Sequence, residues 1–276
     1  MYSIENLIKT ALNEDIGSGD ITTDNLIAPD LAGRGVVVAR ENIVVAGLDV
    51  ACRVFECLDP EIIFRPECKD GDTVLNDKVI LKVEGKLRNI LMGERTALNF
   101  LQHLSGIATH VRSYVDMLGD RKVRLVDTRK TTPGLRVLEK YAVRIGGAFN
   151  HRMGLYDGVL IKDNHIAACG SIKKAVQNIR DNVSHLLKIE VEVSSLTQVR
   201  DAIEAGVDVI MLDNMGLDMI KQSIKYIDKR SLVEVSGQIT KDTLNQMADS
   251  GVDIISVGAL THSAGSVDLS MHIEHV

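Results

Sequence analysis

Six short apolar segments in the second half of the chain constrain its fold more than any other feature. They lie roughly 20 to 35 residues apart and alternate with stretches of helical hydrophobic spacing. The segments are residues 123–128, 158–162, 187–193, 207–212, 231–236 and 253–258. Because nearly continuous apolar strands are typical of sheets buried on both faces, the pattern predicts successive βα units and a parallel sheet covered by helices.

An internal repeat supports this prediction. The segments EAGVDVIMLDN (204–214) and DSGVDIISVGA (249–259) both run from a helix end through glycine, valine and aspartate into a strand. The glycine is placed as a helix C-cap. Six such units form an open or incomplete barrel unless a further strand lies upstream, and a doubly wound sheet is the alternative.

Chemically useful residues follow each of the six predicted strands. They are Asp127 to Lys130, Lys162, Glu192, Asp213 with Asn214, Ser236 with Gly237, and Gly258 with Ala259. In a β/α barrel, functional residues gather at the C-terminal strand ends around one mouth. This arrangement favours the barrel over the doubly wound sheet.

The first hundred or so residues predict a smaller α+β unit. Its expected elements are a helix capped by Ser3 and ending near Asp15, a loop at 17–26, a strand pair in 33–47 broken at Glu41, a helix at 49–58, and strands near 62–64 and 79–84. A long helix is expected at 88–118, with Gly106 as a candidate break. The tail SVDLSMHIEHV alternates apolar and polar residues, which predicts a strand with one buried face.

The distribution of charge indicates a small anionic ligand. The formal net charge is −6, yet arginine and lysine are concentrated in residues 127–165. A local positive pocket suits a small molecule with several anionic groups, whereas a nucleic-acid binder is usually basic over a whole face. Tryptophan is absent and aromatic residues make up 3%, which also argues against nucleic-acid stacking.

Other sequence features place the protein in the cytoplasm. No apolar run approaches the ~18 residues of a membrane span, and the N-terminal residues lack the pattern of a signal peptide. The cysteines, at positions 52, 57, 68 and 169, show neither zinc-ligand spacing nor a disulfide framework. We therefore expect no membrane association and reduced thiols.

Four strings carry a resemblance to a known family. TRKTTPG, EKYAV, GGAFNHRMGL and LIKDNH, together with ERTALNFLQHLSGIAT upstream, closely resemble the quinolinate phosphoribosyltransferases, in order over nearly the whole chain. The resemblance implies phosphoribosyl transfer from phosphoribosyl pyrophosphate to quinolinate with decarboxylation, giving nicotinate mononucleotide, CO₂ and pyrophosphate for NAD biosynthesis. It implies Mg²⁺, no organic cofactor, and a homodimer with shared active sites, whose further assembly stays open.

The resemblance also implies a fold and its domain boundaries. The family has an open or incomplete parallel β/α barrel preceded by an α+β domain, to which the C-terminal strand returns. The corresponding domains here are residues 1–105 with 264–276, and the barrel domain 106–263.

By matching motif, the resemblance assigns roles to individual residues. Arg129, His151, Arg152 and Arg95 of the partner subunit would hold the two carboxylates of quinolinate. Lys130 and Lys162 would contact substrate anions. The catalytic set would be Lys130, Lys162, Glu192 and Asp213, and the two acids would contact metal through magnesium pyrophosphate. Ser236, Gly237, Gly258 and His262 would bind phosphate.

Without the resemblance, simpler interpretations stay open for these residues. Arg95 can be a solvated helix arginine, His151 a structural histidine, and Glu192 and Asp213 partners in salt bridges. The chain also departs from the family pattern at Ala148 and Gln238, where glycine is common.

Alternative functions are also open at this point. One is a barrel that binds an anionic metabolite without turnover. Another is an aldolase that uses Lys162 as a Schiff base, which needs a lysine in apolar surroundings. A related molybdenum-linked branch of similar proteins is a nearer rival, but the intact NHR and KDNH strings favour the quinolinate enzyme.

Overall fold

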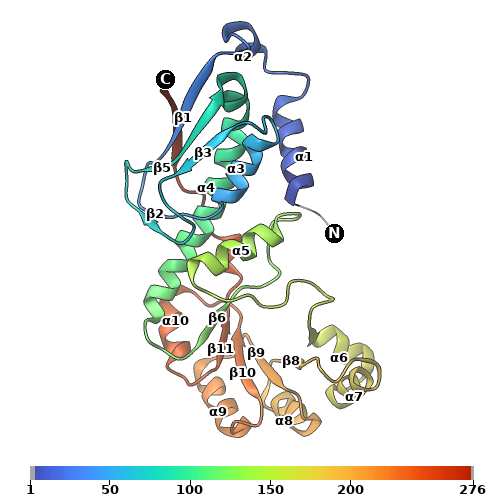
Figure 1. Ribbon diagram of the computed structural model, residues 1–276. Helices are drawn as coiled ribbons and strands as arrows, with labels where there is room; N and C mark the ends of the chain where they lie inside the picture. The colour runs from blue at the N-terminus through green and yellow to red at the C-terminus, as the bar shows by residue number, and fades with distance from the viewer. Residues whose placement is uncertain (1–3, 275–276) are drawn as a thin grey trace. The chain divides into compact units, whose positions relative to one another are not determined.

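The protein is described by a computed structural model over residues 4–274, in which two compact units share the chain (Figure 1). The first unit comprises residues up to Arg112, residues Thr132–Gly147, and residues from Ser263 onward. The second comprises Ser113–Thr131 and Ala148–His262. The first unit thus includes a segment, 132–147, that the sequence boundaries assign to the barrel domain. The Ser3 cap lies outside the described residues.

The first unit is an α+β structure built on a four-stranded antiparallel sheet of order β12-β1-β5-β3, with β2 and β4 as a separate pair. Its elements are α1 (Ile4–Ile16), α2 (Ile21–Leu26), β1 (Ala32–Ala39), β2 (Ile43–Val44), α3 (Leu48–Glu56), β3 (Ile63–Pro66), β4 (Thr73–Val74), β5 (Val79–Lys86), α4 (Leu87–Leu118), α5 (Arg136–Gly146) and β12 (Leu269–Glu274). The predicted return of the C-terminal strand is confirmed, since Val37 of β1 pairs with Met271 of β12.

Three local predictions for this unit were wrong. Residues 21–26 form helix α2 because Asp20 caps its N-terminus, accepting hydrogen bonds from the Thr22 and Thr23 amides at 3.0 and 2.9 Å. The strands in 33–47 do not pair with each other, because β2 pairs with β4. Gly106 does not break α4. A Cβ there would overlap the Gly265 carbonyl oxygen, so the glycine allows close backbone packing.

Helix α5 belongs to the first unit through specific contacts. Arg112 donates to the Gly146 carbonyl at 3.0 Å, and the Tyr141 hydroxyl donates to Asp70 at 2.6 Å. The buried carboxylate of Glu139 lies 2.9 Å from Nε2 of His103 on α4. These contacts explain why this segment packs with residues far away in sequence.

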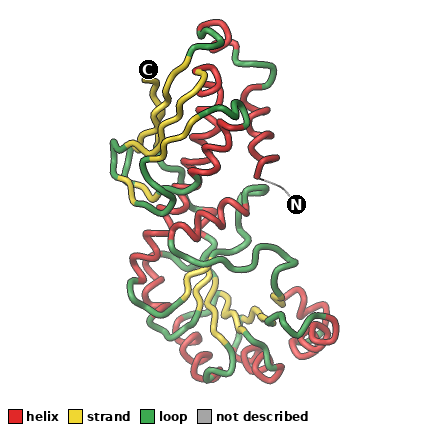
Figure 2. Tube along the Cα trace, viewed as in Figure 1, coloured by secondary structure: helices red, strands yellow, loops and turns green. Residues whose placement is uncertain are grey.

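The second unit contains the six predicted strands, all parallel, in the order β6-β11-β10-β9-β8-β7. Figure 2 shows the strands of this unit flanked by helices. Its elements are β6 (Arg124–Val126), β7 (Val159–Ile161), α6 (Asp163–Cys169), α7 (Ile172–Asn182), β8 (Ile189–Val193), α8 (Leu196–Ala205), β9 (Val209–Asp213), α9 (Leu217–Ile227), β10 (Leu232–Ser236), α10 (Lys241–Ala248), β11 (Ile254–Ser256) and α11 (Ala259–His262). The C-cap glycine predicted for both repeats is confirmed after α8, where Gly206 is left-handed with φ 69°. It is wrong for the second repeat, because the C-cap of α10 is Asp249, two residues before Gly251.

The strand order identifies an open barrel. Strands β7 to β11 are neighbours in chain order and β6 returns beside β11, whereas a doubly wound sheet reverses its order at an internal switch point. Among the described residues β6 and β7 are not paired, so the barrel is open between them. An isolated parallel bridge joins Val126 of β6 to Phe149. The C-terminal ends of all six strands therefore face one mouth. None of the helices within residues 4–274 is long and apolar enough to span a bilayer.

Candidate active site

A cavity of about 850 Å³ lies within the second unit, and its walls include the C-terminal strand ends. The predicted site residues that line it are Arg129, Lys130, His151, Arg152, Lys162, Glu192, Asp213, Ser236, Gly237, Gly258 and His262. The barrel topology thus brings together side chains spread over more than a hundred positions. A cavity of this size accommodates a small-molecule ligand.

The loop after β6 carries two of the cations. The Thr261 hydroxyl donates to the Lys130 carbonyl at 2.7 Å, which ties this loop to α11. A Cβ on Gly258 would lie 2.8 Å from Cδ of Lys130 and 3.2 Å from Nε2 of His262. The glycine therefore allows these two basic side chains to approach the end of β11.

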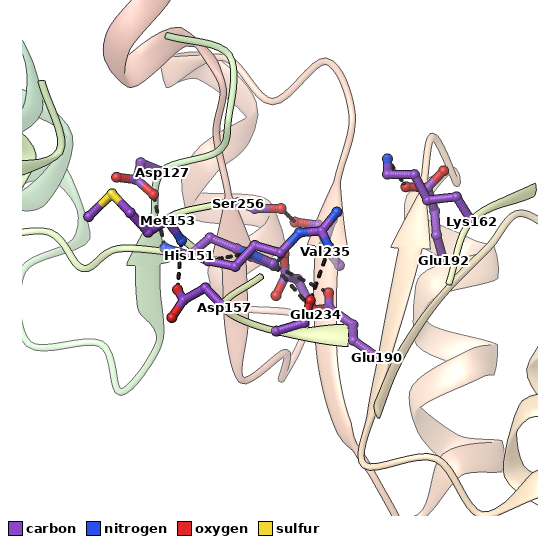
Figure 3. A network of polar contacts seen from close by, with 12 residues as sticks. Asp127, His151, Met153, Asp157, Lys162, Glu190, Glu192, Glu234, Val235 and Ser256 are labelled. Carbon is purple, nitrogen blue, oxygen red and sulfur yellow. Dashed lines mark hydrogen bonds and ion pairs between the residues drawn. The ribbon is translucent and has the colours of Figure 1, made fainter. Parts of the chain in front are cut away.

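His151 lines the cavity and belongs to a network of polar contacts (Figure 3). Its backbone amide donates to the buried Asp127 at 2.9 Å, and its ring Nδ1 accepts from the Arg152 amide at 2.7 Å. Its Nε2 lies 3.1 Å from a Glu190 oxygen and 3.6 Å from a Glu234 oxygen. Both ring nitrogens are thus engaged within the protein.

Arg152 extends from the same turn into the cavity, and its guanidinium donates to the Gly158 carbonyl at 3.0 Å. Burial and the neighbouring Arg129 lower the pKa of Arg152, while Glu190 acts in the opposite direction. Two arginines held close together in a partly buried place form an anion site, because an anion relieves their mutual repulsion.

Lys162 and Glu192 form an ion pair at 2.6 Å between Nζ and Oε2, separate from the His151 network in Figure 3. The backbone amide of Lys162 donates to Nδ1 of His165, which fixes the start of α6. Asp213 ends β9 and accepts from the Asn214 side chain at 2.7 Å. Lys162 therefore does not have the apolar surroundings that the aldolase alternative needs.

The loop after β10 has an unusual backbone. Gly237 has φ 96°, and a Cβ there would overlap Asn214. Gln238, where the resemblance leads us to expect glycine, is also left-handed with φ 46°. An exposed glutamine in this conformation carries a strain of about 1–2 kcal/mol. The second departure, Ala148, is buried at 4% exposure with no positive φ.

Glu190 and Glu234 were not predicted from the sequence. They lie mid-strand, with exposures of 8% and 1%, below the cavity residues Glu192 and Ser236. Burial, with repulsion from Glu190, raises the pKa of Glu234 to about 7. The available signal was a charged residue inside a predicted buried strand, since both faces of such strands are normally aliphatic.

Arg95 is the one predicted site residue that does not line this cavity. It lies on α4 in the first unit, with a side chain that is 57% exposed and 3.9 Å from the Glu94 carboxylate. The role predicted for it depends on a second copy of the chain.

Comparison with known proteins agrees with the fold. The family model described as quinolinate phosphoribosyl transferase, N-terminal domain, matches residues 20–105, and that described as its C-terminal domain matches residues 107–272. The chain belongs to the quinolinate phosphoribosyl transferase family.

Individual relatives cover nearly the whole chain. A probable carboxylating nicotinate-nucleotide pyrophosphorylase of Synechocystis sp. is 49% identical over 95% of this chain and 90% of its own length. A protein of Bacillus subtilis with the same description is 44% identical over 98% of this chain and 93% of its own. The crystal structure of NadC from Streptococcus pyogenes superposes with a TM-score of 0.95 at 45% identity, covering 99% of this chain and 97% of that one.

Proposed function

We propose that the cavity of the second unit is where this enzyme transfers phosphoribosyl from phosphoribosyl pyrophosphate to quinolinate, with loss of CO₂ and pyrophosphate to give nicotinate mononucleotide. The observation that carries the proposal is the convergence of eleven motif-matched residues on one cavity at the strand ends. The test is release of pyrophosphate and CO₂ that depends on quinolinate and is lost in Arg152→Ala. Turnover of phosphoribosyl pyrophosphate without quinolinate would contradict it.

The basic part of the cavity is suited to the substrate anions. Arg129 and Arg152 offer planar forks to the quinolinate carboxylates, and His151 lines the same cavity. Lys130 supplies a compact charge for substrate anions, and Lys162 can contact both the pyridine carboxylate and the phosphoribosyl donor. Close placement of these groups orients the ring nitrogen toward C1 of the ribose.

Glu192 and Asp213 are suited to the charge that develops on the sugar. As the bond from C1 to the pyrophosphate oxygen breaks, positive charge grows on the ribose, and nearby carboxylates stabilise it. Their oxygens also fit Mg²⁺, which prefers one or two carboxylates plus substrate phosphates. Bound in that way, the ion would neutralise charge on the departing pyrophosphate.

In this proposal the loops after β10 and β11 bind phosphate. Gly237 and Gly258 leave their backbone amides unobstructed by side chains, and the Ser236 hydroxyl and His262 add polar groups beside them. Once the ring nitrogen is quaternised, loss of the 2-carboxylate as CO₂ leaves a carbanion at C2 beside a positive charge, and this carbon then takes up a proton from water. The protein then needs mainly to hold the geometry, and no covalent nucleophile is required.

The active site is proposed to be shared between the subunits of a homodimer, with Arg95 of the partner subunit completing the carboxylate site. The support is the motif match together with the exposed position of Arg95 on α4. An isologous interface would complete two equal sites at once. A cytoplasmic location stays a prediction from the sequence.

Subunit complementation tests the shared site. Arg95→Ala and Lys162→Ala chains, mixed unfolded and refolded together, should form hybrids in which one site carries both defects and the other neither. With random pairing about half the dimers are hybrid, so activity should recover to roughly a quarter of wild type. Recovery no greater than the mean of the two parents would mean that Arg95 does not act across the interface.

A further inference from the structure

Two glutamates occupy a layer of the barrel interior where aliphatic side chains are usual. Side chains two positions apart on a strand share a face, so Glu190 lies one layer below Glu192, and Glu234 one layer below Ser236. Glu192 and Ser236 line the cavity, which places the lower pair beneath its floor. The side chains of Glu190 and Glu234 are only 11% and 2% exposed.

Stability alone does not account for this pair. Burying a carboxylate costs several kcal/mol, and well-packed apolar residues of similar volume are often as stable or more so. Within residues 4–274 no hydrogen bond reaches Glu234 Oε1, which lies 3.6 Å from Nε2 of His151. The two acids therefore have a use that offsets the cost of burial.

The contacts of His151 indicate that use. Because Nδ1 accepts a hydrogen bond from the Arg152 amide, the ring carries its hydrogen on Nε2, and that N–H faces the two carboxylates. The shorter contact is to Glu190, at 3.1 Å. A ring with its hydrogen on Nε2 has no lone pair there for a metal, so these three groups do not form a metal site in this state.

The ring is one of several anchors of the turn that carries Arg152. Another is Asp127, which accepts from the His151 amide at 2.9 Å and from the Asn150 side chain at 2.6 Å. The glutamates hold the imidazole from below, and its Nδ1 in turn accepts a hydrogen bond from the Arg152 amide. Figure 3 shows His151 between Asp127 on one side and the two glutamates on the other.

We infer that Glu190 and Glu234 are positioning residues, which hold the His151 ring from beneath and so fix the turn that presents Arg152 to the quinolinate carboxylates. The inference rests on the proposed roles of His151 and Arg152 in the cavity. Neither glutamate lines the cavity, so we assign both an effect that passes through the histidine.

Steady-state kinetics of Glu190→Ala test this inference. Loss of one charge-assisted hydrogen bond beneath the ring should raise KM for quinolinate about tenfold, with KM for phosphoribosyl pyrophosphate within about twofold of wild type. Glu190→Gln keeps an acceptor for the Nε2 hydrogen and should recover most of the loss. Glu204→Ala is the matched control, because this glutamate is exposed on α8 and does not line the cavity, and its constants should not change.

Coupling to the histidine separates positioning from a purely structural role. In a His151→Ala background, Glu190→Ala should have no further effect on KM for quinolinate. Additive effects, or equal rises in KM for both substrates, would overturn the inference while leaving the proposed function intact. Failure of the proposed function differs, since the wild-type enzyme would then show no quinolinate-dependent pyrophosphate release.

A spectroscopic measurement covers the case in which Glu190→Ala does not fold. The histidine signal that His151→Gln lacks, in a ¹⁵N spectrum, identifies the His151 ring. In the wild-type enzyme this signal should show a hydrogen on Nε2 and none on Nδ1. A hydrogen on Nδ1 would overturn the inference, as would stoichiometric Zn²⁺ binding that His151→Gln abolishes.

Discussion

The buried Glu234 predicts an unusual dependence of stability on pH. Its pKa lies at about 7 in the folded protein against an ordinary value of 4.5, so between these pH values the folded chain keeps a proton that the unfolded chain has lost. The stability from this group is therefore fully present below pH 4.5 and is lost as pH rises through 7. At about 1.4 kcal/mol per pH unit, the loss comes to roughly 3 kcal/mol.

Replacement of the carboxyl by an amide should remove this loss. Glu234→Gln stays neutral at every pH, so its free energy of unfolding relative to wild type should rise by about 3 kcal/mol between pH 4.5 and 8. Urea unfolding followed by circular dichroism at several pH values measures the difference. The same pH slope for variant and wild type would refute the reasoning.

Glu139 provides a control of opposite sign. Burial tends to raise its pKa, but hydrogen bonds from His103 and Thr132 outweigh burial and lower it. Its stabilising effect is therefore present above pH 4.5 and is lost as pH falls. Glu139→Gln should destabilise the protein at pH 8, and the deficit should shrink in acid.

Three further sets of substitutions test the site and the fold. Arg152→Ala should lower kcat/KM for quinolinate by about one to two orders of magnitude, and Arg152→Lys should recover it only in part, because a point charge does not replace the planar fork; unchanged constants would contradict this. Glu192→Gln and Asp213→Asn should lower kcat while quinolinate binding, measured by calorimetry, persists; unfolding with normal activity per folded molecule would favour a structural role. Gly106→Ala should lower the free energy of unfolding by about 1–3 kcal/mol through backbone overlap with Gly265, and should lower the thermal midpoint accordingly.

The sequence predicted the barrel well because its signals are local. Each strand is a short apolar run followed by a chemically useful residue, and the parallel topology places all those ends at one mouth. Lys162 and Glu192 illustrate this, since each was identified by its place at a strand end and the two form an ion pair in the structure. The anionic character of the ligand was predictable for the same reason, because the arginines and lysines of residues 127–165 are concentrated along the chain itself.

The features that escaped prediction depend on tertiary contacts. Glu190 lies inside the run IEVEV, where an alternating pattern does not reveal whether the inward face is apolar. Gly106 looks like a helix break until the C-terminal segment is seen to pack against it. Helix α2 forms from a polar string because a single aspartate, Asp20, caps it.

The position of β12 in the chain also determines the order in which the protein can fold during synthesis. Strand β1 lacks its outer partner until β12 emerges, and 230 residues separate Arg40 from its partner Ser270. At roughly 5–20 residues per second, a ribosome needs about 10 to 50 s to make that stretch. The whole barrel unit is translated in this interval, while the edge of β1 is open to pairing with other chains. The first unit is therefore the first whose synthesis begins and the last whose folding can be completed.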